Sequence, residues 1–112
     1  MPSLSDAAVR LPAVAGMFYP GSADELGADV DRMLGKAAAG PRAPAPKAII
    51  VPHAGYIYSG PIAASAYARL RPARGRIQRV VLLGPAHRLP FRGFALPSVS
   101  RCSLRWRNSS GV

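Results

Sequence analysis

The sequence predicts an α/β fold, a partial α/β/α sheet whose core is a parallel β-α-β unit. Residues 47–51 and 79–83 are short and almost unbroken apolar runs, which are typical of strands buried on both faces of a parallel sheet. A helix-forming segment lies between the two runs, and the chain there is long enough for a right-handed crossover connection. These observations indicate one small domain, since 112 residues can enclose only a modest core.

The first regular element is expected to be a helix over residues 22–38, after a loose tail at 1–9 and an irregular segment at 10–20. Ser22 and Glu25 form a capping box, in which each side chain accepts a hydrogen bond from a backbone N–H that the first turn leaves free. Apolar residues recur on one face of this segment. Alternating Ala and Pro residues then predict a stiff surface connector.

A second helix is predicted over residues 61–70, between the two predicted strands. Pro61 suits the first turn of a helix, and Ser59 or Gly60 would then lie near its cap. A turn over 72–76 leads into the second predicted strand, and residues 94–96 form a weaker strand candidate.

Composition and charge bear on whether the chain is a membrane protein, a secreted protein or a nucleic-acid binder. No apolar run reaches the length of a membrane span, the N-terminus has no secretory pattern, and a single cysteine cannot form an internal disulfide, so we expect a cytoplasmic location. The formal charge is +10, and all five acidic residues lie before residue 32. A basic nucleic-acid binder is therefore an alternative, although few aromatic residues lie among the arginines to stack on bases.

His53 and His87 are the candidate metal ligands. Each follows the end of a predicted strand beside Pro and Gly. Ligands bind outside the carboxyl ends of parallel strands, so two imidazoles on neighbouring loops would face one metal ion or substrate oxygen. The alternative is an ordinary hydrogen-bonded histidine at each strand end. Two ligands are also fewer than the three protein groups of a typical catalytic metal site.

The loops that carry the two histidines contain the candidate pocket residues. Backbone N–H groups before the second helix could hold an anion or a carboxylate, but the segment is neither a P-loop nor a nucleophile elbow. The two tyrosines are expected to divide between pocket and core. The pocket residues we expect are Gly55, Tyr56, Tyr58, Ser59, Gly84 and Pro85.

Three motifs resemble the Memo family, also named AmmeMemoRadiSam system protein B. They are R-L-P-A-V-A-G-M-F-Y-P near the start, P-H-A-G-Y-I-Y-S-G in the middle and L-L-G-P-A-H-R further on, and the resemblance covers about residues 10–99. It implies a fold similar to the class III extradiol (LigB-type) dioxygenases, with iron or copper at the metal-binding positions His53 and His87. The reaction and the substrate are undefined, and the family name implies a radical-SAM protein as a partner.

The sequence departs from the family pattern at two places. Ala86 stands where the family usually has Ser before the second histidine. From Ser100 the residues no longer match, and we expect a truncated chain with an aberrant, frameshifted tail over 100–112. The resemblance implies further ligands, a His and a Cys, in a part that this chain lacks, and Cys102 does not match them. We therefore expect a fragment that is of low stability and inactive on its own.

Overall fold

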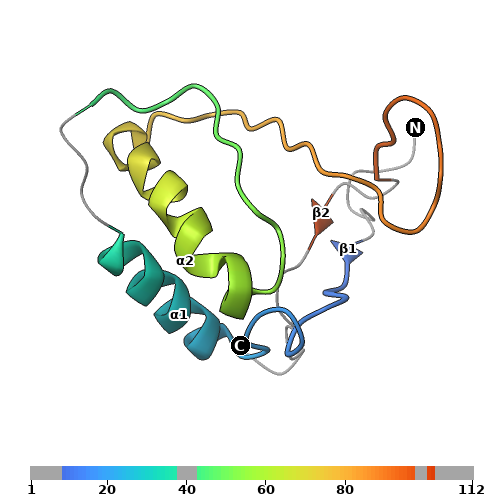
Figure 1. The fold of residues 1–112 in the computed structure, drawn as a ribbon, viewed down its shortest axis with the longest axis horizontal. Helices are drawn as coiled ribbons and strands as arrows, with labels where there is room; N and C mark the ends of the chain where they lie inside the picture. The colour runs from blue at the N-terminus through green and yellow to red at the C-terminus, as the bar shows by residue number, and fades with distance from the viewer. Residues whose placement is uncertain (1–8, 38–42, 98–100, 103–112) are drawn as a thin grey trace.

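Two helices packed side by side and a long extended stretch dominate the fold (Figure 1). The computed structural model describes residues 9–37, 43–97 and 101–102. Its elements, in chain order, are strand β1 (Val9–Arg10), helix α1 (Ala23–Lys36), helix α2 (Tyr56–Tyr67), the 3-10 helix η2 (Ala68–Ala73) and strand β2 (Arg101–Cys102). None of the helices in these ranges combines the length and the apolar character that crossing a bilayer requires.

Helix α1 confirms the first predicted helix. Ser22 is the N-cap in an extended conformation, and its hydroxyl accepts a hydrogen bond of 3.1 Å from the backbone N–H of Glu25. The reciprocal bond from Glu25 to the Ser22 N–H is not among the hydrogen bonds of the described residues. At the other end, the N–H of Ala37 donates to the carbonyl of Met33. The acidic first turn and Lys36 in the last turn also match the polarity of the helix dipole.

Helix α2 begins earlier than predicted, at Tyr56 with Gly55 as its N-cap. The Gly55 carbonyl accepts hydrogen bonds from the N–H groups of Tyr58 and Ser59, which closes the first turn there. Pro61 therefore lies inside the helix and not in its first turn, so the prediction of Ser59 or Gly60 as a cap is wrong. The helix starts early because Phe18 helps to hold its first turn, and the carbonyl of Phe18 accepts the Tyr56 N–H at 2.7 Å.

The two helices pack closely at Gly60 of α2, which has no side chain. A Cβ at Gly60 would collide with the sulfur of Met33, so glycine permits the approach of α1. Beyond α2, the Arg71 guanidinium donates 2.8 Å to the Leu34 carbonyl near the end of α1. The buried core is nevertheless small. Within the described ranges, the buried apolar side chains are those of Ala64 and Ala73, and no large side chain is fully buried.

The predicted β-α-β core is not formed in the described residues. Residues 47–51 and 79–83 lie outside regular secondary structure, neither segment pairs as a strand, and both predictions are wrong for this structure. The weaker candidate at 94–96 is not a strand either. A strand needs a neighbour for its N–H and C=O groups, whereas a helix satisfies them internally. The helix of the predicted unit therefore forms without the sheet that it was expected to cover.

The two-stranded sheet that the described residues do form was not predicted. β1 and β2 are parallel, with Val9 opposite Arg101 and Arg10 opposite Cys102. Val9 was assigned to the loose tail, whose other residues lie outside the described ranges. Most of the segment predicted as an aberrant tail also lies outside them.

Candidate functional site

The structure brings His53 and His87 together. Their Nε2 atoms are 3.1 Å apart, their ring centroids are 5.2 Å apart, and the ring planes are tilted by 43°. Both residues are exposed. They meet without the shared sheet edge from which their convergence was predicted, so that argument fails although its two residues are adjacent. The contact joins the turn before α2 to the extended stretch after residue 83.

The turn after His53 is held at two points. The Ser59 hydroxyl, 6% exposed, donates 2.7 Å to the carbonyl of Ala54 and also lies 3.3 Å from that of Gly55. The Tyr56 N–H donates to the carbonyl of Phe18, which lies in the loop before α1. A buried hydroxyl that bonds to backbone carbonyls four and five residues earlier restricts the path of the turn. The His53 backbone is therefore anchored to α2. Through α2 it is also anchored to the loop of residues 16–20 before α1, which we call the N-terminal loop.

His87 lies in a less constrained segment. Residues 74–97 are all exposed, and the structure records no hydrogen bond for His87 within the described ranges other than the one with His53. Gly84 and Pro85 line an open cavity of about 620 Å³, and all of its lining residues lie between Leu82 and Leu96. The rest of its lining is mostly apolar and includes Leu82, Phe91 and Phe94.

The spacing of the two Nε2 atoms suits two kinds of interaction. Neutral imidazoles can share one hydrogen bond, with one ring donating and the other accepting. An ion bonded to both nitrogens at about 2.0–2.1 Å would see them roughly 95–102° apart, between octahedral and tetrahedral angles. Imidazole suits iron and copper. Within the described residues no third His, Cys, Asp or Glu joins the pair, so the chemistry of the donors fits a metal and their number does not complete its shell.

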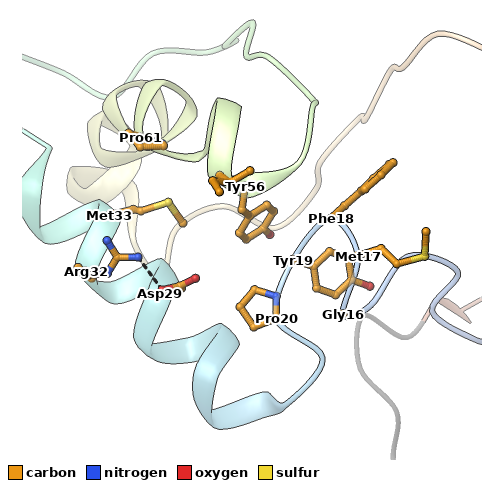
Figure 2. A pocket seen from close by; sticks show the side chains of 11 residues that line it. Gly16, Met17, Phe18, Tyr19, Pro20, Asp29, Arg32, Met33, Tyr56 and Pro61 are labelled. Atoms are coloured by element: carbon orange, nitrogen blue, oxygen red, sulfur yellow. Dashed lines mark hydrogen bonds and ion pairs between the residues drawn. The ribbon is translucent and has the colours of Figure 1, made fainter.

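A second cavity, of about 470 Å³, lies between the N-terminal loop and the two helices (Figure 2). The rings of Tyr19 and Tyr56 face each other there with centroids 5.7 Å apart. On α1, the Arg32 guanidinium pairs with the Asp29 carboxylate at 2.6 Å. Sequence analysis missed this cavity, although the aromatic M-F-Y-P run before the helix was a usable signal.

The six predicted pocket residues do not share one cavity. Tyr56 lines the cavity of Figure 2, whereas Gly84 and Pro85 line the other one. Gly55 caps α2 and Ser59 is buried in it, as already described. Tyr58 is 79% exposed and lines neither cavity. The predicted pocket residues are thus divided between two separate cavities, and neither histidine lines either of these two cavities.

Comparison with known proteins shows which proteins the sequence of this chain is similar to. The family model described as Memo-like protein matches residues 10–104. The chain is 49% identical over 105 residues to a MEMO1 family protein of Aquifex aeolicus, which covers 93% of the chain and 35% of that relative. It is 41% identical over 92 residues to Protein MEMO1 of Danio rerio, covering 80% of the chain and 26% of the relative. No solved structure matches the chain.

These matches bear on two expectations, namely that the chain is only part of a Memo-like protein and that its tail from Ser100 is foreign. The chain spans between about a quarter and a third of the length of the curated relatives, as the Aquifex and zebrafish values of 35% and 26% show. The family match also includes the first residues of the segment from Ser100 that we predicted to be a foreign tail. The origin of that segment stays a prediction.

Proposed function

This chain belongs to the Memo-like protein family, and we propose that it carries part of a metal-binding, non-haem, dioxygenase-like domain of oxidoreductase type. His53 and His87 would hold the metal. Iron or copper, when bound, would supply redox chemistry at the end of the two loops. The finer fold that we propose for the whole domain, the LigB-type α/β arrangement, rests on the resemblance of the sequence motifs. The reaction and the substrate are not specified by this proposal.

One observation carries the proposal. The imidazoles of the only two histidines in the chain come from segments far apart in sequence, and their Nε2 atoms approach to 3.1 Å. Nothing in the local pattern of either segment forces this contact, since one is a helix-capping turn and the other an irregular stretch with a bend at His87. A metal ion would explain why two imidazole nitrogens converge at the surface, where each could otherwise bond to water.

The Ser59 hydroxyl supports the same function by holding the turn that follows His53. Its bond to the Ala54 carbonyl limits the positions that the His53 backbone can take. On the other side, Pro85 limits the backbone two residues before His87, because its ring restricts φ. These residues act through the two histidines and are positioning residues.

A second candidate is a non-catalytic metal-binding or interaction module of the same fold. It is favoured by the exposed apolar side chains of Val80, Val81 and Leu82, which are suited to contact with another polypeptide. Oxygen uptake on candidate catechols by a full-length relative loaded with iron or copper separates the candidates. Turnover supports the oxidoreductase, and metal binding without turnover of any catechol supports the module. A cytoplasmic location and a radical-SAM partner stay predictions.

The test of metal binding is an equilibrium titration of the chain with Cu(II), and with Fe(II) under anaerobic conditions. We expect one ion per chain and weak affinity, because two protein ligands leave most of the coordination shell to water. His53→Ala and His87→Ala should each weaken binding about tenfold or more. Cys102→Ser is the control, since it removes the only thiol and should leave affinity unchanged.

The outcome of the histidine variants decides the proposal. If both single variants bind metal as tightly as the unmodified chain, this pair is not the ligand set. The contact would then be a hydrogen bond between two loop residues.

A further inference from the structure

Five basic residues gather at one end of the helix pair, and we call them the basic cluster. They are Lys36 at the end of α1, Arg69 and Arg71 on η2, and Arg74 and Arg76 in the turn that follows. The Arg71 guanidinium joins the two parts, because it donates 2.8 Å to the Leu34 carbonyl near the end of α1. In Figure 1 the end of α1 and the yellow segment after α2 lie at the same end of the pair. All five residues are exposed.

The turn after η2 holds its arginines on an ordered backbone. The Arg74 N–H donates 3.0 Å to the Arg71 carbonyl, and the Arg76 N–H donates 2.9 Å to the Ala73 carbonyl. Ala73 is buried, and Gly75 adopts a φ of 78°, which residues with a side chain rarely adopt. The positive charges are therefore concentrated in one place and not spread along a loose segment.

No carboxylate neutralises the basic cluster within the described residues. The ion pair that they contain lies within α1 and involves no member of the cluster. Asp31 is the acidic residue nearest to this end of α1 in sequence, and it pairs with none of the five. Asp24 and Glu25 lie in the first turn of α1, about 14–15 Å along the helix from Leu34. Their charges are screened there, since the screening length at physiological salt is about 8 Å.

Only part of the cluster has a role in the fold. Lys36 and Arg71 lie at the carboxyl end of α1, where the last backbone carbonyls favour cations, and Arg71 bonds to one of these carbonyls directly. The side chains of Arg69, Arg74 and Arg76 form no hydrogen bond or ion pair in the part of the chain that the structure describes. Neighbouring like charges repel one another in the folded state. A bound anion would relieve this repulsion.

We propose that the basic cluster binds the phosphate backbone of a double-stranded nucleic acid without preference for its sequence. Guanidinium groups bind phosphate oxygens through paired hydrogen bonds, and a duplex presents phosphates at high density. No aromatic residue lies between Ala68 and Arg76, so the cluster lacks the stacking surface on which single strands bind. An anionic membrane fits less well, because no large apolar side chain in this segment is exposed for insertion.

The test is the fluorescence anisotropy of labelled DNA and RNA duplexes of about 20 base pairs, titrated with the chain in a buffer that contains a metal chelator. We expect the duplexes to bind with affinities that do not depend on base sequence. The affinity should fall about a hundredfold or more between about 50 and 200 mM salt, as four or five phosphate contacts predict. Binding of one kind of duplex and not the other identifies the nucleic acid. Because the chelator removes metal from the histidines, the result is independent of the proposed metal site.

Two triple variants separate the cluster from the net charge of the chain. The first combines Arg69→Gln, Arg74→Gln and Arg76→Gln, and it should lower the affinity about tenfold or more and the slope of log affinity against log salt by about three. The control combines Arg10→Gln, Arg88→Gln and Arg92→Gln, which remove the same charge from β1 and from residues 88–92, away from the cluster (Figure 1). It should change the affinity less than about threefold. Far-ultraviolet circular dichroism of both variants should match the unmodified chain, because all six residues are exposed.

The proposal is overturned by any of four results. The chain binds neither duplex at about 50 mM salt, or the two triple variants weaken binding equally, which would assign binding to net charge alone. A single strand of the same length binds more tightly than the duplex. Vesicles that contain phosphatidylserine bind the chain at a lower phosphate concentration than the duplex does, which would make an anionic membrane the partner.

Discussion

The helical region, residues 22–37 and 56–73, and the extended stretch of residues 77–97 differ in how the hydrogen-bonding groups of their backbones are satisfied. In the helical region, α1 and α2 close their own hydrogen bonds, and the loop carbonyl of Phe18 adds a further bond to α2. In the extended stretch every residue is exposed and no backbone hydrogen bond is recorded within the described ranges. The helices thus satisfy their own backbone groups, whereas the backbone groups of residues 77–97 are open to solvent within the described ranges.

The histidine pair joins these two regions. His53 belongs to the anchored side, where Ser59 fixes the following turn, whereas His87 belongs to the exposed side. We therefore expect a site that is half rigid. Changes in the helical region should accordingly alter the free energy of unfolding more than changes in residues 77–97 do.

The largest expected effect on the helical region is that of Gly60→Leu. A leucine at this position overlaps the Met33 side chain, which must move aside or push the helices apart, and this should lower the free energy of unfolding by up to about 3 kcal/mol. Gly27→Leu is the matched control in α1, where nothing lies within 4 Å of an added Cβ. It should stabilise the helix by up to about 1 kcal/mol. Urea unfolding followed by circular dichroism measures both, and equal effects would mean that the helices do not pack at Gly60.

Ser59→Ala should have the next largest effect and should reach the site. The carbonyl of Ala54 loses its buried donor, at a cost of about 1–2 kcal/mol in the free energy of unfolding. The turn after His53 should also loosen, which amide hydrogen exchange at Gly55 and Tyr56 would detect. Ser65→Ala is the control, because that hydroxyl is exposed and bonds only to the Ile62 carbonyl of its own helix. Unchanged exchange in Ser59→Ala would remove Ser59 from its positioning role.

Ser22→Ala should have the smallest effect, about 1 kcal/mol, through the lost bond to the Glu25 N–H. Ser22→Asp keeps an acceptor at the cap and should retain the stability of the unmodified chain. Thermal melting of the three proteins by circular dichroism provides the comparison. If Asp fails to restore what Ala loses, the cap is not the cause.

Sequence reasoning succeeded where the deciding interactions were local. The start of α1 follows from Ser22 and Glu25, which lie within one turn of each other. It failed at the start of α2, because the bond from Tyr56 to Phe18 spans a connector that no local pattern describes. It also failed for residues 79–83, since an apolar pattern indicates that a strand can be buried and not which strand will pair with it.

The candidate site was predictable only as a pair of residues. The motifs around His53 and His87 identified both side chains, but the predicted sheet edge is absent from the described residues and the contact arises from two loops. The cavity of Figure 2 was missed because Tyr19 and Tyr56 were read in separate segments. Their approach depends on how the N-terminal loop folds over α2, which lies beyond helix and strand periodicity.

The most direct test of the account is a nuclear magnetic resonance titration of the chain labelled with ¹⁵N in its histidine rings. Only two imidazoles are present, so single variants assign every ring nitrogen. We predict that stepwise addition of excess Zn²⁺, a diamagnetic ion bound by imidazole, shifts both Nε2 resonances together along one binding curve. Separate curves for the two rings, or a shift of only one of them, would contradict the convergence of His53 and His87 on a single ion.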